Sequence, residues 1–353
     1  MPISHPIDDL YVHERFKHGS REKELAEFEE HARRVTAVQR TLADEHSHGM
    51  PQRVFHAKAH ACLAGTLRLL DNRPPETRHG IFGPGGKASY NVLARFSSGV
   101  GFVQHDLKPD VRGIALKIFG VGGAGSTNGE SRRTRDFLMT NSTNPFGNDQ
   151  QEFVEFMQAS LGPIRLAGFL VSHPRIARLL VRTTARILIP SLATEQYWSG
   201  HPYLLGPQRA MKFNVRPASP SDRVPVETDV ARADRNYLRL ELRARLARAP
   251  IRLVFSIQLE KDPDTTPIED ALVEWKESDS PSIPVAELLL DREIDAEACR
   301  TLRFTPGNFI SDHRPLGNMG RGRIFTYAAS QVARNADAEE PREERFFGGQ
   351  VAA

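Results

Sequence analysis

The sequence predicts a protein of mixed α and β structure with a substantial core. The chain has 353 residues, of which 39% are hydrophobic and 26% charged, as in an ordinary globular protein and unlike a disordered one. Short apolar runs bounded by glycine and proline are typical of strands. Two longer segments carry apolar residues at helical spacing. This length is compatible with two domains or one large domain.

Charge and cysteine content exclude several functional classes. The formal net charge of +3 is too small to predict a nucleic-acid groove. Cys62 and Cys299 supply neither a disulfide framework nor a CxxC zinc site. The N-terminus has no cationic region followed by an apolar one, so no secretory signal is predicted. No stretch reaches the roughly 18 uncharged apolar residues of a membrane span. We therefore expect a soluble, cytoplasmic protein that binds no nucleic acid.

Residues 20–45 predict a surface helix, because one face is apolar and the other almost wholly charged. Ser20 suits the N-cap position, and Glu22 and Glu24 would lie in the first turn. The apolar positions at helical spacing are Leu25, Phe28, Ala32, Val35 and Leu42.

Strands are predicted where short runs alternate in polarity or are rich in β-branched residues. Residues 251–260 (IRLVFSIQLE) give a well-supported strand. The other predicted strands are residues 53–70, 91–98, 112–120 and 136–140.

Residues 150–192 predict helices, interrupted at Gly162-Pro163, Pro174 and Pro190. Residues 228–248 fit a strand through alternating leucines and a helix through their Arg and Ala content, and periodicity does not decide between them. Loops are predicted at 120–133 and 216–226, and a charged, solvated tail at 336–346.

Two local patterns resemble functional motifs but favour simpler interpretations. Gly120, Gly122 and Gly125 match GxGxxG, yet no apolar helix follows them to present its N-terminus to a pyrophosphate, which favours a connecting loop. His56 and His60 have the spacing of metal ligands on a helix. We predict a strand here, on which four residues span about 13 Å, too far to share one ion.

Arginines recur along the predicted helices beside apolar residues. Such a face could bind an anionic membrane surface or an acyl substrate. An amphipathic helix packed on the protein with a solvated cationic face is the favoured interpretation. The arginines are Arg175, Arg178, Arg182 and Arg186.

Four segments, in chain order, together resemble the haem-containing catalase family. Any one of them would be weak, but their joint occurrence over roughly residues 50–335 is specific. They are RVFHAK (53–58); RFS (95–97) followed by DVRGIALK (110–117); DFLMTN (136–141); and RIFTY (323–327).

The resemblance implies an α+β fold, in which an antiparallel eight-stranded β-barrel with flanking helices holds a haem beside the barrel. Closing the sheet removes its exposed edges. Residues 228–248 become a helix on this interpretation. The chain divides into an N-terminal arm and surface helix (1–49), a catalase-like haem domain (50–335) and a charged tail (336–353). One haem b, with its iron, is expected per chain.

Tyr327 is the expected iron ligand, because tyrosinate is the proximal ligand of catalases. A phenol has a pKa of about 10, so its anion needs stabilisation at neutral pH. Arg323 lies four residues earlier, on the same face of a helix, and its guanidinium would favour the phenolate.

On the opposite side of the haem, the resemblance places His56, Ser97 and Asn141. His56 would take a proton from one peroxide oxygen and return it to the other. Ser97 would hold the second imidazole nitrogen and so determine the tautomer. Asn141 would donate its amide to the peroxide.

The resemblance also places Arg53, Arg95 and Arg334 at the propionate-binding positions, where guanidinium groups suit carboxylates. Aromatic residues that could pack on the haem are Phe55, Phe96, Phe153 and Phe156, the last two more in keeping with the core.

The expected function is haem-dependent cleavage of the O–O bond of peroxides, with hydrogen peroxide or an organic hydroperoxide as substrate. Alternatives are rearrangement of fatty-acid hydroperoxides, as in the related allene oxide synthases, and haem binding without catalysis. Phe55 stands where catalases have valine and those synthases threonine. The chain has only 19 residues after Arg334, so no NADPH site is expected. A homo-oligomer and peripheral membrane contact are left open.

Overall fold

The computed structural model describes residues 10–121, 133–185, 189–226, 234–336 and 341–348. Among these residues no helix is long and apolar enough to cross a membrane. Gly122, Gly125 and Arg186, which belong to the patterns discussed above, lie outside the described residues.

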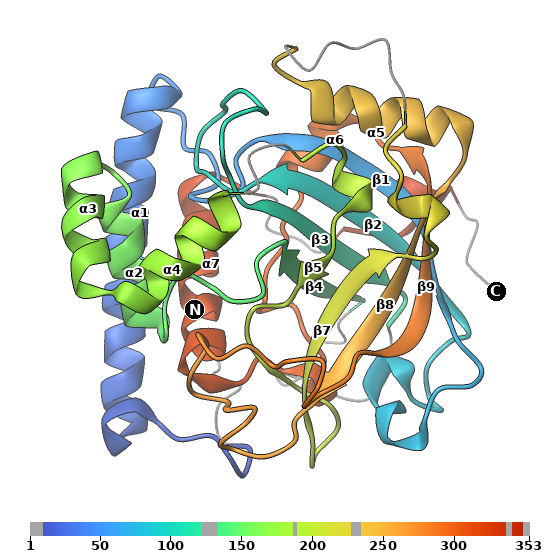
Figure 1. Cartoon of the computed structure of the whole chain (residues 1–353), viewed down its shortest axis with the longest axis horizontal. Coiled ribbons are helices and arrows are strands. Elements are labelled where there is room, and N and C mark those ends of the chain that lie inside the picture. The colour runs from blue at the N-terminus through green and yellow to red at the C-terminus, as the bar shows by residue number, and fades with distance from the viewer. Residues whose placement is uncertain (1–9, 122–132, 186–188, 227–233, 337–340, 349–353) are drawn as a thin grey trace.

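Eight strands form a closed antiparallel barrel, which confirms the predicted fold class (Figure 1). The hydrogen-bonded order is β5-β4-β3-β2-β1-β9-β8-β7, and the pairing of β7 with β5 closes the barrel. The short strand β6 pairs with Ala210 and Met211 of β7, which β5 does not reach. The bounds are β1 Ala59–Leu69, β2 Ser89–Ser98, β3 Arg112–Phe119, β4 Thr134–Thr140, β5 Tyr197–Trp198, β6 Tyr203–Leu204, β7 Ala210–Pro217, β8 Ile251–Leu259 and β9 Ile283–Glu293.

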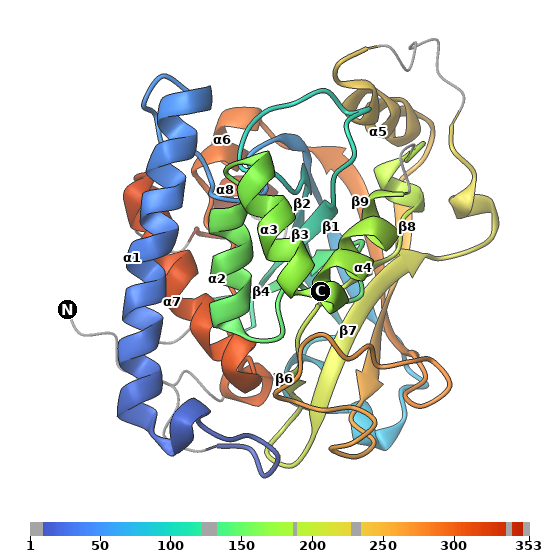
Figure 2. The same ribbon diagram turned by 60° about the vertical axis from the view of Figure 1, so that its left-hand side comes forward.

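Helices flank the barrel, and α7 lies between α1 and the strands (Figures 1 and 2). The ambiguous segment 228–248 contains a helix, α5, over its described part, as the resemblance implied. The breaks at Gly162-Pro163 and Pro174 separate α2, α3 and α4 as predicted. The bounds are α1 Arg21–His46, α2 Gln150–Ala159, α3 Pro163–Ser172, α4 Pro174–Thr184, α5 Tyr237–Arg248, α6 Ala296–Thr301, α7 Gly317–Ala333 and α8 Glu344–Phe347.

Helix α1 begins as predicted, with the Ser20 hydroxyl accepting a hydrogen bond from the Lys23 N–H. Its apolar face buries Phe28 and Val35. Glu24, expected only as a favourable first-turn charge, is 1% exposed, because Arg321 of α7 binds it at 2.9 Å. Helix α1 is therefore joined to the C-terminal part of the fold by a buried ion pair.

Alternation along β1, β2 and β3 separates the barrel core from the outer face. Phe96 is fully buried in the core cluster inside the barrel. Its neighbours Arg95 and Ser97 therefore point outward, toward the helices. Phe96, which the sequence offered as an aromatic that could pack on a haem, lies in the barrel core, on the opposite face of the sheet from Arg95 and Ser97.

Two sequence-based expectations are wrong. Residues 53–58 are not part of a strand, because β1 begins at Ala59 and His56 has the left-handed φ of 59°. The segment predicted to be a solvated tail (336–346) is also partly packed against the protein. Phe346 of α8 is buried against Phe119, with ring centroids 6.1 Å apart. The apolar Phe346 side chain gives this segment a reason to pack.

The arginine-rich helix α4 lies on the protein and makes ion pairs with it. Arg175 binds Asp270 at 3.0 Å and Arg182 binds Glu274 at 3.2 Å. Ile176 on the same helix is buried. This packing agrees with the simpler of the two interpretations of the arginine-rich segment.

Candidate active site

His56 lies in the loop before β1, and Ser97 lies near the end of β2. The Ser97 hydroxyl oxygen is 3.1 Å from His56 Nδ1. The backbone of the loop is also bound to the sheet, because the His56 N–H donates to the Gly99 carbonyl at 2.8 Å. The His56 carbonyl accepts a hydrogen bond from Arg95 at 2.8 Å. These bonds determine where the imidazole stands on the outer face of the barrel.

Gly113 of β3 provides the room for the imidazole. A Cβ at this position would lie 2.6 Å from His56 Cε1 and 3.3 Å from the Ser97 hydroxyl. Carbon atoms do not approach this closely, so a side chain at residue 113 would displace His56. The glycine of the DVRG sequence is therefore a requirement of the site.

The surroundings of His56 keep its imidazole neutral. Burial, followed by the charges of Arg95, Arg323 and Arg53, lowers its pKa to about 3. At neutral pH the ring therefore has one N–H and one lone pair. A neutral imidazole held by a hydroxyl group can accept a proton from a small molecule.

Arg323 and Tyr327 form the second pair of the site, on one face of α7. Arg323 donates to the Tyr327 hydroxyl at 2.9 Å, as their spacing predicted. Burial would lower the pKa of Arg323, but nearby Tyr327 and Tyr203 outweigh this effect and raise it. Because the Arg323 charge also acts on His56, the two pairs border the same region between barrel and helix α7.

A cluster of guanidinium groups borders the same region. Arg53 and Arg334 both donate to the Leu302 carbonyl, at 2.7 and 3.2 Å. Burial and the charges of Arg95 and Arg334 lower the pKa of Arg53 well below its usual range. The buried Arg95 Nε has no hydrogen-bond partner. Such a cluster is suited to binding an anionic group that would compensate its charge.

Asn141 follows β4 and is held by two partners. Its Oδ1 accepts the Arg112 N–H at 2.8 Å, and its Nδ2 donates to the Glu195 carboxylate at 3.0 Å. Arg112 is adjacent to Gly113, which places Asn141 near the His56 loop. Glu195 was not anticipated, because no motif in the sequence connects it to a site 54 residues earlier.

Comparisons with known proteins agree with this architecture. The chain is 32% identical over 186 residues to a catalase-related peroxidase of Mycolicibacterium paratuberculosis, a match that covers 50% of this chain and 56% of that protein. A fungal catalase has a TM-score of 0.66 at 18% identity, covering 82% of this chain and 60% of its own. Catalase A from Saccharomyces cerevisiae gives 0.67 at 17% identity, covering 94% and 69%. The chain has the catalase fold.

The same likeness extends to a bacterial catalase, with a TM-score of 0.65 at 20% identity over 84% of this chain and 60% of the catalase. No family model matches the sequence. The matched region of this chain covers little more than half of the length of the related peroxidase. The solved structures thus show a catalase-like fold, and half of the chain is similar in sequence to a catalase-related peroxidase.

Part of the catalase-like motif is scaffold. Arg112 is 2% exposed and donates to the Asp106 carbonyl at 2.7 Å. Lys117 binds Asp136 at 2.6 Å, and Asn308 donates to the same carboxylate at 3.0 Å. These polar side chains join strands to loops. This part of the motif therefore stabilises the fold, and its side chains do not contribute groups to the candidate site.

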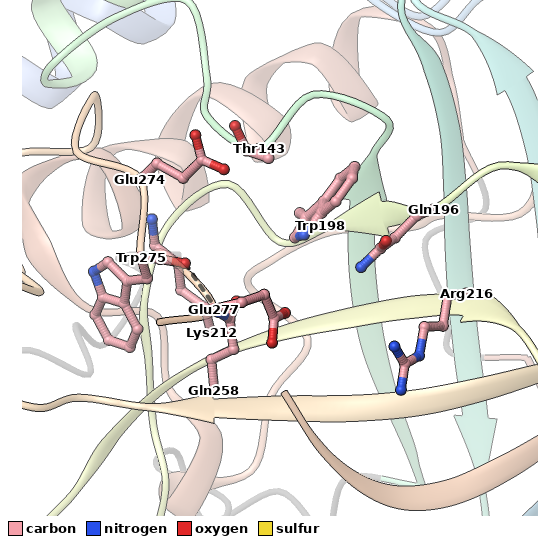
Figure 3. A pocket seen from close by; sticks show the side chains of 9 residues that line it. All are labelled: Thr143, Gln196, Trp198, Lys212, Arg216, Gln258, Glu274, Trp275 and Glu277. Atoms are coloured by element: carbon pink, nitrogen blue, oxygen red, sulfur yellow. Dashed lines mark hydrogen bonds between the residues drawn. The ribbon is translucent and has the colours of Figure 1, made fainter. Parts of the chain in front are cut away.

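A separate polar cavity of about 250 Å³ is lined in part by side chains of β5, β7 and β8 (Figure 3). Burial lowers the pKa of its Lys212 to about 7, although Glu274 and Asp270 counteract this effect. Lys212 Nζ lies 5.3 Å from the centre of the Trp275 ring. None of the predicted site residues is among those lining it, which are Thr143, Gln196, Trp198, Lys212, Arg216, Gln258, Glu274, Trp275 and Glu277.

Proposed function

We propose that this catalase-like chain is a haem-dependent enzyme that cleaves the O–O bond of peroxides. One observation carries the proposal: the His56–Ser97 pair and the Arg323–Tyr327 pair border the same region, since the Arg323 charge acts on the His56 imidazole. The region thus holds a proton acceptor and a phenol whose oxygen is bound by a guanidinium group. Catalases use this combination of groups on the two sides of a haem.

The residues fit a haem. Tyr327 would ligate the iron, with Arg323 favouring the phenolate form. The propionates would meet Arg53, Arg95 and Arg334. The partnerless Arg95 Nε and the mutual repulsion within this cluster both support an anionic ligand there. The outward direction of Arg95 and Ser97 agrees with a cofactor beside the barrel rather than inside it.

The chain's own residues would handle the protons of the reaction. When bound, the haem supplies the redox-active iron at which the peroxide bond is broken. With the proton of the imidazole on Nδ1 and donated to the Ser97 hydroxyl, His56 would keep the Nε2 lone pair to accept a proton from one peroxide oxygen and return it to the other. Asn141 would orient the peroxide through its amide, whose position Glu195 and Arg112 maintain.

The substrate is tested by comparing two reactions as kcat/KM. Oxygen evolution from hydrogen peroxide measures the catalase reaction, and consumption of a polyunsaturated fatty-acid hydroperoxide measures the organic reaction. Product analysis of the second distinguishes reduction to an alcohol from rearrangement. Absence of every activity in haem-loaded protein would contradict the proposal.

Haem binding without catalysis is the alternative, and His56→Ala discriminates it. We expect this variant to bind haem as the wild type does and to lose peroxide turnover. If the wild type shows no peroxide turnover and binds haem with the same affinity as the variant, the protein binds haem without catalysis.

A further inference from the structure

The two cysteines of the chain meet on the outer face of the barrel. Cys62 of β1 and Cys299 of α6 belong to one hydrophobic cluster and are 3% and 4% exposed. The Ile294 N–H, five residues before Cys299, donates to the Cys62 carbonyl at 2.9 Å and holds the α6 segment against β1. A hydrogen bond joins the two thiol groups. Residues 237 positions apart thus form a close dithiol pair.

The two thiols differ chemically. The hydrogen bond from Cys62, together with Arg95 and Arg53, overcomes burial and lowers the pKa of Cys299 to about 7. Burial, together with Cys299, raises the pKa of Cys62 well above its usual range. Near neutral pH, about half of Cys299 is therefore a nucleophilic thiolate, whereas Cys62 is a protonated thiol. This is the division of roles in a reactive pair that closes to a disulfide.

The pair is also next to the candidate active site. Arg95 is hydrogen-bonded to Cys299 and also donates to the His56 carbonyl. One guanidinium thus contacts both the nucleophilic sulfur and the loop that carries the proposed proton acceptor. A peroxide that reaches this region would approach Cys299 as well as His56.

We propose that Cys62 and Cys299 are a peroxide-oxidisable dithiol that closes to an intramolecular disulfide beside the propionate-binding arginines. This inference goes beyond the proposed function and needs no haem; its oxidant is a peroxide. No sequence pattern indicates the pair, because only the fold brings β1 and α6 together.

The reaction balances with peroxide as the oxidant. The Cys299 sulfur attacks one peroxide oxygen, an S–O bond forms, and the O–O bond breaks. The departing oxygen takes up the proton that the Cys299 thiol released and leaves as water or an alcohol. The Cys62 sulfur then attacks the Cys299 sulfur, an S–S bond forms, and the S–O bond breaks. The released hydroxide takes the Cys62 proton and leaves as water. The thiols lose two electrons and two protons, and the peroxide gains them.

Intact-protein mass spectrometry of the reduced chain treated with hydrogen peroxide tests the proposal. The chain has two cysteines, so one intramolecular disulfide can form. We expect the mass to fall by two hydrogen atoms, and digestion to yield a peptide linking Cys62 and Cys299. A wild type that keeps both thiols titratable, forms only linked dimers or gains only sulfinic oxygen would overturn the proposal.

Two variants assign the roles. Cys62→Ser removes the resolving thiol, so Cys299 should stop as a sulfenic acid that dimedone traps. Cys299→Ser should slow thiol oxidation at least about tenfold, because the remaining thiol is protonated. Equal oxidation rates in the two variants would refute the assignment. Both variants should retain haem-dependent peroxide turnover. Thiol oxidation therefore tests the dithiol proposal, and turnover tests the proposed function independently of it.

Discussion

At residue 56 the fold combines a left-handed backbone with a neutral imidazole. Asn and His tolerate positive φ better than most side chains, but such a conformation persists only where surrounding contacts maintain it. Here the Gly99 carbonyl binds the residue's N–H and Arg95 binds its carbonyl. The same arginine helps to lower the pKa of the ring. Arg95 thus helps to determine both the backbone conformation of His56 and the neutral state of its ring.

The neutral state of His56 predicts the pH dependence of catalysis. A base with a pKa of about 3 stays unprotonated as the pH falls from 8 to 5, so its contribution to kcat/KM should be constant over this range. Activity should decline only toward pH 3. The check is a pH profile of kcat/KM for peroxide, with fold monitored by circular dichroism. An acid limb centred near the ordinary histidine pKa of about 6.5 would contradict the prediction.

Tyr327→Phe should remove the proposed iron ligand without disturbing α7, because only one hydroxyl group and its bond from Arg323 are lost. We expect haem content to fall, or the Soret and charge-transfer bands of the haem-loaded protein to change. Absorption spectra after titration with haemin provide the measurement. Arg323→Ala is the companion variant, in which the phenol remains and its counter-charge is lost. Spectra identical to those of the wild type in both variants would refute ligation by Tyr327.

Among the elements, the strands were easier to anticipate than the loop that carries the proposed base. Arg95 and Ser97 share a face because residues alternate on a strand, and their common direction follows from sequence alone. The RVFHAK segment has strand-like composition, yet β1 begins after it. Its conformation depends on the Gly99 and Val100 carbonyls, which tertiary structure supplies. Local periodicity carries no information about such contacts.

Strand β3 supplies a test of how closely the barrel wall fits the site. Gly113→Ala would place a methyl group 2.6 Å from His56 Cε1, so the imidazole must shift away from Ser97. We expect kcat/KM to fall by about tenfold or more while the barrel stays folded, since misplacing a catalytic group by about 1 Å can cost far more.

The matched control is Gly85→Ala, because nothing lies within 4 Å of a Cβ at that turn residue. It should leave kcat/KM unchanged. If the two alanine variants have equal activity, the close contact of β3 with His56 has no functional importance.

Over the whole molecule, Arg321 joins segments that are distant in the sequence. It lies 2.6 Å from Glu14, 2.9 Å from Glu24 and 3.3 Å from Glu269. These partners belong to the N-terminal arm, helix α1 and a loop of the barrel. The described part of residues 1–49 is therefore held against α7 by buried charge, although the sequence indicated only a surface helix there.

Arg321→Leu should destabilise the fold strongly, because it leaves the buried Glu24 carboxylate without its counter-charge and Glu14 with Arg314 as its remaining arginine partner. Loss of one partner of a buried ion pair costs about 3–5 kcal/mol. Denaturant unfolding measures the change. Glu30→Gln breaks the exposed pair with Arg33 on α1 and should cost less than about 1 kcal/mol. Similar losses in the two variants would contradict a special role for Arg321.

The barrel closes through its shortest strand. In β5, Tyr197 and Trp198 pair with Val215 and Asn214 of β7, and Trp198 also pairs with Thr140 of β4. So short a seam has few hydrogen bonds to break, and it is where the cylinder would open in local unfolding. Glu195 precedes the seam by two residues and binds Asn141. We expect transient opening of this seam to loosen the Glu195 bond to the amide proposed to orient peroxide, while the bond from the Arg112 N–H remains. Local unfolding of the barrel would then limit the fraction of time for which the site is fully assembled.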